Sequence, residues 1–171
     1  MVSDPPKKAI QDAITYRAAG LGDVGELARI RASEWGTIPY WQDRISGYII
    51  GKSNPGHALA PRTVVAAVRA EKIVGFAAAH LTRRLGCSGE LQWINIDRES
   101  RGLGIATGLL GHVAHWFVSQ ESIRVCVDPD DEARAFYVRL GAQPLGDHWL
   151  VWPDISVLVS RATVREKSSH R

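Results

Sequence analysis

The sequence predicts a single domain of mixed α and β structure, in the α/β (α+β) class. The chain has 171 residues with 45% apolar content, which is enough for one core. Short apolar runs typical of strands alternate with segments of helical spacing. The apolar run at 91–96 also leads into a glycine-rich turn that opens a helical segment. These features together indicate a sheet covered by helices.

Seven strands are expected from apolar runs bounded by turn residues. They are predicted at residues 14–17, 63–68, 73–80, 90–96, 122–127, 143–145 and 149–152. The second and third are joined by a tight turn around 70–72. Cys126 lies in an alternating run and is expected to be a small buried residue.

Four helices are expected, at residues 23–33, 41–50, 104–118 and 130–140. Asp23 and Glu26 have the spacing of a capping box at the start of the first. The last has one apolar face, acidic residues in its first turn and a glycine after its end, as helix termini prefer. Its apolar face is formed by Ala133, Phe136, Tyr137 and Leu140.

The charge pattern separates the domain from its ends. The whole chain carries +3, and residues 161–171 alone account for it. We therefore predict a flexible polar N-terminus at 1–12, a domain at 13–160 and a basic flexible tail at 161–171. The balanced domain gives little reason to expect a nucleic acid partner. The chain has no apolar run of transmembrane length, so no membrane is expected, and two cysteines without a disulfide pattern fit the cytoplasm.

The glycine-rich turn Arg101-Gly102-Leu103-Gly104-Ile105-Ala106 predicts a phosphate site. The first N–H groups of a helix lack internal partners and lie at its positive end, and glycines let an anion approach the backbone. No Gly-Lys-Ser or Gly-Lys-Thr follows, which excludes the nucleotide-kinase loop. Thr107 stands where a dinucleotide fingerprint needs a third glycine.

Two motifs resemble the GNAT superfamily of acyl-CoA-dependent N-acyltransferases. Arg101, Gly104 and Ala106 match its Arg-x-x-Gly-x-Ala turn. The helix at 130–140 is similar to its Asn-x-x-Ala-x-x-Phe-Tyr-x-x-x-Gly-Ala segment, except that Asp130 stands in place of Asn. The resemblance covers about residues 14–159, is strongest at 90–142 and is weakest at 35–62.

The resemblance implies a single GNAT-like domain with a mixed, mostly antiparallel sheet of about six to seven strands, flanked by about four helices and splayed between strands 4 and 5. It implies acetyl-CoA as acyl donor, with its pyrophosphate on the glycine turn and its pantetheine amides along 94–96. The oxyanion donor would be a backbone N–H near Ile96. The implied acetyl-CoA contacts are Ile94, Asn95, Ile96, Arg101, Gly102, Leu103, Gly104, Ile105, Ala106, Thr107, Asp130, Ala133 and Phe136.

Transfer to an amine needs an acid for the leaving thiolate and a base for the ammonium. Tyr137 is the expected acid, since an ordinary tyrosine pKa of roughly 10 keeps it protonated. Glu90 is the expected base, because several family members carry a catalytic Glu there. A solvated residue after the turn at 88–89 is an equally good interpretation of Glu90.

The acceptor is expected to be a small-molecule or peptide amine. Trp35, Tyr40 and Trp41 would form its wall, since aromatic faces attract an ammonium, with Glu34 and Asp43 adding charge. No metal is expected, because His112 and His115 lack a third ligand nearby. A homodimer is left open. Two rival functions remain: a non-catalytic acetyl-CoA-binding sensor of the same fold, and a small nucleotide-binding α/β module.

Overall fold

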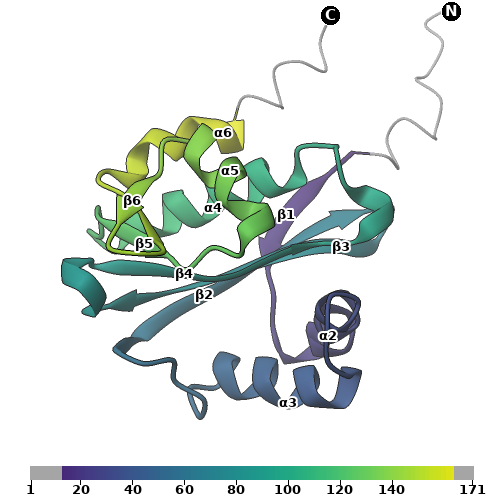
Figure 1. The fold of residues 1–171 in the computed structure, drawn as a ribbon. Helices are drawn as coiled ribbons and strands as arrows, with labels where there is room; N and C mark the ends of the chain where they lie inside the picture. Colours follow the sequence, from purple (N-terminus) through teal and green to yellow (C-terminus); the bar gives the residue numbers. More distant parts are fainter. Residues whose placement is uncertain (1–12, 164–171) are drawn as a thin grey trace, which may run out of the picture.

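The structure is a computed structural model that describes residues 13–163 (Figure 1). Within that range, seven strands form one sheet in the order β1-β2-β3-β4-β5-β7-β6. Strands β4 and β5 run parallel and every other neighbouring pair is antiparallel. The predicted mixed, mostly antiparallel sheet is therefore confirmed. The strands are β1 (Thr15–Ala18), β2 (Ala58–Arg69), β3 (Lys72–Thr82), β4 (Gly89–Ile96), β5 (Val125–Val127), β6 (Gln143–Leu145) and β7 (Trp149–Trp152).

Helices cover both faces of the sheet (Figure 1). One face carries α2 (Val24–Ala32) and α3 (Ile38–Ile49). The other carries α4 (Ile105–Ser119), α5 (Asp131–Arg139) and α6 (Val159–Thr163). Short 3₁₀ turns connect them: η1 (Leu21–Asp23), η2 (Arg84–Gly86), η3 (Arg98–Ser100) and η4 (Ile155–Leu158).

The sheet separates two hydrophobic cores. Alternate residues of a strand point to opposite faces. Phe76 and Ala78 accordingly pack with α2 and α3, whereas Ala77 and Ala79 pack with α4. This alternation anchors β3 on both sides and makes it a rigid centre of the fold.

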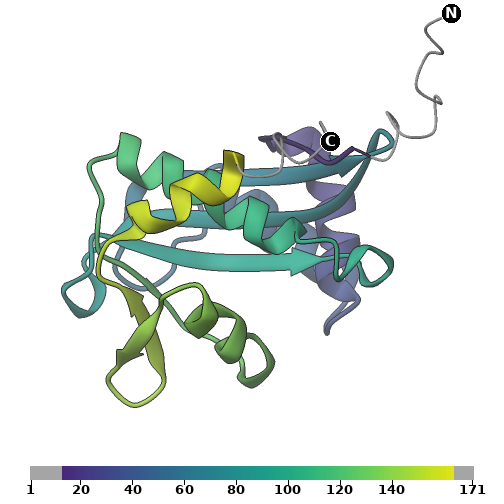
Figure 2. The ribbon, with the colours of Figure 1, turned by 90° about the horizontal axis from the view of Figure 1, so that it is seen from above.

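The sheet opens between β4 and β5, as predicted. Only three residue pairs join these strands, and the last is Leu91 with Val127. Beyond it the unit of β5, α5, β6 and β7 turns away from β4 (Figure 2). A β-bulge lies at the same point, because Ala79 faces Leu91 while Ala78 faces Trp93, leaving Gln92 as the extra residue.

The start of α2 differs from prediction. The predicted capping box between Asp23 and Glu26 is wrong, since the Asp23 side chain does not cap α2. The chain is already helical at Asp23 because η1 precedes α2, so its carboxylate turns back to the Gly20 N–H and to Arg17, at 2.9 Å from each. Glu26 instead pairs with Arg29 at 3.2 Å.

The predicted tail begins too early. Residues 161–163 belong to α6, which packs against α4. Gly111 permits this contact, because a side chain there would overlap the backbone of Ala162. The segments 1–12 and 164–171 that were predicted to be flexible lie outside the described residues. In the described part of the chain, no helix has the length and apolar character needed to cross a membrane.

Several predicted elements also change length. Helix α3 begins at Ile38 rather than at residue 41, because the Thr37 hydroxyl accepts a hydrogen bond from the Tyr40 N–H and Pro39 suits a first helical turn. Strands β2 and β3 are longer than predicted and extend as a paired ribbon beyond the sheet centre. Strand β5 is shorter, since the Ser122 N–H bonds to Phe117 at the end of α4 instead of to a strand.

Candidate active site

A cleft of about 950 Å³ lies where β4 and β5 separate. Its walls are the end of α2, the exposed edge of β4, the glycine turn with the first turn of α4, and one face of α5. All of the predicted acetyl-CoA contacts except Leu103 line this cleft. Leu103 is 38% exposed and does not line it.

One end of the cleft is suited to an anion. Gly102 and Gly104 have φ angles of 78° and 73°, which L-residues with side chains rarely adopt, and they bend the chain into α4. The first internal hydrogen bond of this turn is from Gly108 to Gly104, so the N–H groups at 105–107 have no helical partner. No acidic residue lies in the first turn of α4. Its positive end therefore remains open to a ligand.

The N-terminus of helix α5, unlike that of α4, is capped by its own side chains. The Asp130 carboxylate accepts a 2.7 Å hydrogen bond from the Ala133 N–H, and two further acids occupy the first turn. This helix start is satisfied by its own side chains. Asp130 lines the cleft, but its side chain is engaged as a helix cap.

The edge of β4 offers backbone groups to the cleft. The Asp97 N–H bonds to Val74 of β3 at 2.8 Å. Because N–H groups alternate between the two edges of a strand, those of Ile94 and Ile96 point the other way, into the opening. The strands separate at Gln92, so the point of splaying is Gln92 and not Ile96 as predicted.

Tyr137 faces the cleft from α5. Its ring packs edge-on against Trp152, with centroids 5.6 Å apart, and the residue is 3% exposed. Its hydroxyl has no hydrogen-bond partner among residues 13–163. Burial, reinforced by Asp130, raises the pKa of Tyr137 above its ordinary value, so the hydroxyl keeps its proton at neutral pH.

Arg31 of α2 reaches the same cleft and was not anticipated from the sequence. Its guanidinium lies 4.4 Å from the ring centroid of Trp41 and donates a 3.2 Å hydrogen bond to Asn95. Burial lowers the pKa of Arg31, and its Nε has no partner within the described residues. No periodicity or motif marks this arginine in the sequence.

Glu90 differs from both interpretations of its sequence position. Its side chain is not solvated, since the residue is 5% exposed, and it does not line the cleft. It precedes the bulge and lies on the α3 side of the sheet, where its carboxylate contacts His80 at 3.3 Å and Arg84 at 3.2 Å. The carboxylate therefore does not face the cleft directly.

The predicted aromatic wall is only partly exposed. Trp35 is 54% exposed and lines the cleft, and Tyr40 is 41% exposed without lining it. The expected exposure of Trp41 is wrong: it is 2% exposed, and its indole N–H donates to the Trp35 carbonyl at 2.7 Å. Glu34 forms an ion pair with Arg101, so its charge is already compensated.

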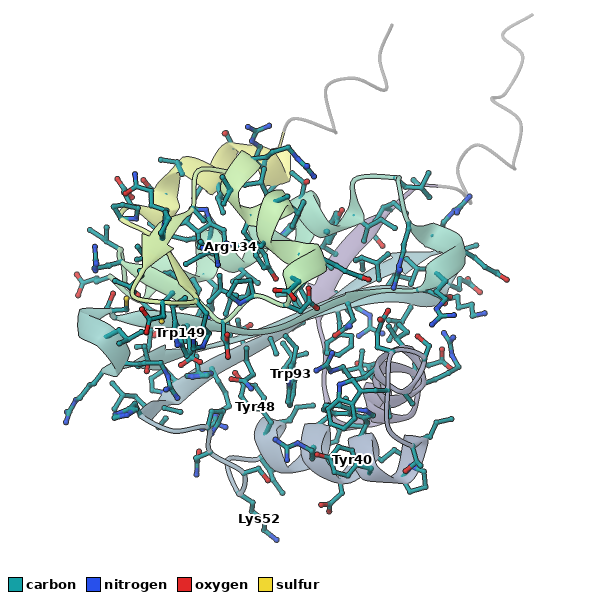
Figure 3. The ribbon with its side chains drawn as sticks, in the orientation of Figure 1. Tyr40, Tyr48, Lys52, Trp93, Arg134 and Trp149 are labelled. Atoms are coloured by element: carbon teal, nitrogen blue, oxygen red, sulfur yellow. The ribbon has the colours of Figure 1, made fainter. Side chains whose placement is uncertain are left out.

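A second cavity of about 240 Å³ lies on the α3 side of β4. Gln92 and Trp93 line both this cavity and the cleft. Tyr48 and Trp93 lie between the sheet and α3 (Figure 3), with ring centroids 5.1 Å apart. No pattern in the sequence marks this cavity, which depends on the bulge at Gln92. Its remaining lining residues are Arg44, Ser53, Asn54 and Pro55.

The histidines of the described chain do not form a metal site with other potential metal-binding side chains. No group of three or more His, Cys, Asp or Glu residues within 13–163 has the arrangement of a metal site. His112 stacks on Tyr16, with ring centroids 4.5 Å apart.

A comparison with protein families identifies the chain. The model of the acetyltransferase (GNAT) family matches residues 26–142, well over half of the sequence. The chain belongs to this family. No curated protein sequence matches the GNAT chain significantly.

Solved structures share the GNAT fold. The PaiA N-acetyltransferase from Thermoplasma acidophilum, in complex with coenzyme A, is 14% identical with a TM-score of 0.62, covering 81% of this chain and 97% of that one. The aminoglycoside 6'-N-acetyltransferase from Enterococcus faecium is 18% identical with a TM-score of 0.62, covering 84% and 97%. A transcriptional regulator from Bacillus halodurans is 18% identical with a TM-score of 0.60, covering 80% and 99%.

Proposed function

We propose that this GNAT protein transfers the acetyl group of acetyl-CoA to a primary amine by direct attack in a ternary complex. The observation that carries the proposal is that one cleft brings together an open helix N-terminus, an unpaired strand edge and the hydroxyl of Tyr137. A diphosphate, an extended amide chain and a leaving thiolate would each meet a suitable group along it.

The acetyl donor fits the residues that are present. Arg101 and the N–H groups at 105–107 would hold the pyrophosphate, and the N–H groups of Ile94 and Ile96 would pair with the pantetheine amides. The backbone near Gln92, where the strands part, supplies the candidate oxyanion donor. The thioester is already activated, so the protein contributes positioning and proton transfer.

Tyr137 is the proposed acid. Its hydroxyl is protonated, buried against the cleft and without a protein partner among the described residues, so it is available to protonate a thiolate. The amine would enter through the second cavity, which shares the lining residues Gln92 and Trp93 with the cleft. This route places donor and acceptor on opposite sides of β4.

The two rival functions make different predictions. A non-catalytic sensor would bind acetyl-CoA and release no CoA with any amine. A nucleotide-binding module would be stabilised by ATP or NAD. A thermal-shift panel separates ligands, since a ligand at a hundred times its Kd stabilises a protein by about 2.7 kcal/mol.

The decisive experiment combines an amine panel with Tyr137→Phe. Wild-type protein is expected to release CoA with at least one amine. Tyr137→Phe keeps the packing and removes the proton, so turnover should fall by about 100-fold or more while acetyl-CoA affinity and melting temperature hold. Tyr16→Phe, on β1 and outside both cavities, is the matched control. Unchanged turnover in Tyr137→Phe would make Tyr137 a core residue.

We also propose a cytoplasmic location. Cys87 and Cys126 are both buried and free, and they pack in one cluster without forming a disulfide. This supports a reducing compartment. We further propose that neither nucleic acid nor a membrane is a partner of this protein. The choice between a monomer and a homodimer stays open.

A further inference from the structure

A chain of hydrogen-bonded polar groups crosses the buried α3 side of the sheet. The Tyr48 hydroxyl lies 2.9 Å from His80 Nδ1, and His80 Nε2 lies 3.3 Å from Glu90 Oε2. Arg84 Nε donates to the same Glu90 oxygen at 3.2 Å. Tyr48, His80 and Glu90 are at most 5% exposed. Three different elements, α3, β3 and β4, contribute these side chains.

The partners at each end set the direction of the chain. Arg84 Nε donates to Glu90 Oε2, and a carboxylate oxygen that receives this bond acts as an acceptor. The His80 Nε2–H therefore donates to Glu90, which leaves Nδ1 to accept the Tyr48 O–H. His80 lies directly opposite Glu90 in the antiparallel register of β3 and β4, so the backbone fixes this contact.

One end of the chain reaches the second cavity. Tyr48 lines that cavity together with Gln92 and Trp93, the two residues shared with the acetyl-CoA cleft. Glu90 and His80 lie behind Tyr48 and line neither cavity. An amine in the second cavity would thus meet Tyr48 before His80 or Glu90.

We propose that Tyr48, His80 and Glu90 form a proton relay that deprotonates the acceptor ammonium. The step rests on the proposed acetyl transfer. An N–H bond of the ammonium breaks as its proton passes to the Tyr48 oxygen, while the Tyr48 O–H proton passes to His80 Nδ1. The electron pair left on the amine attacks the thioester carbonyl. Glu90 stabilises the imidazolium that forms and is a positioning residue.

The surroundings support a relay through Tyr48 rather than a resident phenolate. Burial raises the pKa of Tyr48 above its ordinary value, with Glu90 acting in the same direction and Arg62 against it. The charged and titratable groups around His80 are Arg62 of β2, Arg84 of η2, the Glu90 carboxylate and, beside Glu90, the Cys126 thiol of β5. Only Glu90 in this set stabilises a positive imidazole.

The test is the pH dependence of turnover in Tyr48→Phe. In wild-type protein the rate should be nearly independent of pH around neutrality, because the relay lets the enzyme use the ammonium form of the acceptor. In Tyr48→Phe only the free amine reacts, so the rate should be about 100-fold lower near neutral pH and rise about tenfold per pH unit up to the pKa of the acceptor. Glu90→Gln should lower the rate on this pH-independent plateau and leave the plateau itself, because the carboxylate that stabilises the imidazolium is lost while Tyr48 and His80 remain.

The outcomes separate the relay from the function. Acetyl-CoA affinity and melting temperature are measured in each variant, with Tyr16→Phe as control. An identical pH profile in Tyr48→Phe and wild type, with wild type active, overturns the relay and leaves acetyl transfer intact. A ¹⁵N spectrum showing His80 protonated on Nδ1 instead of Nε2 also overturns it. Wild-type protein that acetylates no amine overturns the proposed function and the relay together.

The charge of the second cavity is an independent observation. Arg44 is its one charged lining residue in the described structure, and no carboxylate lines it. Arg44 lies over Tyr40, 5.5 Å from the ring centroid, and has no acidic partner among residues 13–163. Arg62 adds a second cation next to this cavity, because it donates hydrogen bonds to the Ser53 carbonyl and the Asn54 side chain, two of the lining residues.

We infer that the acceptor is a small amine that also carries an anionic group, a carboxylate or a phosphate. This too rests on the proposed function. A cavity of about 240 Å³ can hold a group of roughly the size of an amino acid. The ammonium would lie at Tyr48 and the anion at Arg44, four residues earlier on the same face of α3. A polycationic acceptor would meet uncompensated positive charge.

The test compares matched amines, such as an amino acid with its amide. The carboxylate form should have a kcat/KM about tenfold higher or more, since a charge-assisted contact to arginine is lost in the amide. Arg44→Gln should remove the preference, and Arg161→Gln on α6 should keep it. Equal or better use of the amide by wild-type protein overturns the inference, while its activity on either amine sustains acetyl transfer.

Discussion

Arg101 of the glycine turn forms an ion pair with Glu34, which follows the end of α2, across the mouth of the cleft. The two residues are 67 positions apart in the sequence and both line the cleft. A pyrophosphate bound to the turn would have to compete with Glu34 for the guanidinium. The pair therefore links the donor end of the cleft to the segment that precedes α3.

Removing Glu34 should strengthen acetyl-CoA binding. The Arg101 side chain is 50% exposed, and exposed ion pairs contribute about 0.2–1 kcal/mol. Glu34→Gln frees Arg101, so affinity measured by titration calorimetry at low salt should rise by about two- to fivefold. Arg101→Gln should weaken binding. Glu26→Gln, which breaks a pair with Arg29 outside the cleft, is the control. Weaker binding in Glu34→Gln would mean that Glu34 itself contacts the donor.

Gly104→Glu should abolish acetyl-CoA binding. It adds bulk and negative charge beside the open N-terminus of α4, where the anion is expected. It also strains a backbone with φ of 73°. Gly146→Glu matches both the charge and the backbone strain, since Gly146 has φ of 64°, yet it lies outside the cleft. Retained affinity in Gly104→Glu, measured by calorimetry, would place the pyrophosphate elsewhere.

The contact between Asp23 and Arg17 should make stability depend on acid pH. The Arg17 hydrogen bond, helped by the Gly20 N–H, lowers the pKa of Asp23 from 3.8 to about 2, although burial acts the other way. Because the pKa of Asp23 is lower in the folded state than in the unfolded state, ionised Asp23 stabilises the fold at pH values above 3.8. This contribution is lost as the pH falls through about 2.

Asp23→Asn should therefore lower the free energy of unfolding at pH 7 by about 1 kcal/mol, after allowing for solvent screening. The difference from wild type should shrink between about pH 4 and pH 2, as followed by denaturant unfolding at each pH. Asp43→Asn removes an exposed α3 carboxylate without an ion-pair partner among the described residues, and it should show no such difference. A constant gap at all pH values would contradict the ion pair.

The sequence predicted elements with strong local signals. The turn at 101–106 and the helix after it were predictable because closely spaced glycines are typical of a tight bend before a helix. Strands β6 and β7 were predicted with their observed bounds. Helix α6 was missed because its packing depends on Gly111 of a distant helix. The capping box failed because η1 had already made the chain helical at Asp23.

The site was harder to predict where side chains come from opposite faces. The donor contacts lie on β4, on the glycine turn with the start of α4, and on α5, and all except Leu103 line one cleft. The place of Glu90 depends on the bulge at Gln92, which reverses the faces of β4 and which local sequence does not specify. Tyr48 carries no motif, although pairing the predicted strands would have placed His80 opposite Glu90.

Two neighbouring tryptophans should respond differently to truncation. Trp41 is in the core with Arg31 on its face, so Trp41→Ala should cost about 3–5 kcal/mol of stability and lower the melting temperature sharply. Trp35 is half exposed at the cleft, so Trp35→Ala should leave the melting temperature nearly unchanged and raise the KM of the acceptor but not of acetyl-CoA. Trp41→Phe keeps an aromatic ring but loses the bond to the Trp35 carbonyl and part of the buried ring volume, so its loss of stability should be smaller than that of Trp41→Ala. If Trp35→Ala changes neither KM, the acceptor does not touch Trp35 and binds wholly within the cavity beside Tyr48.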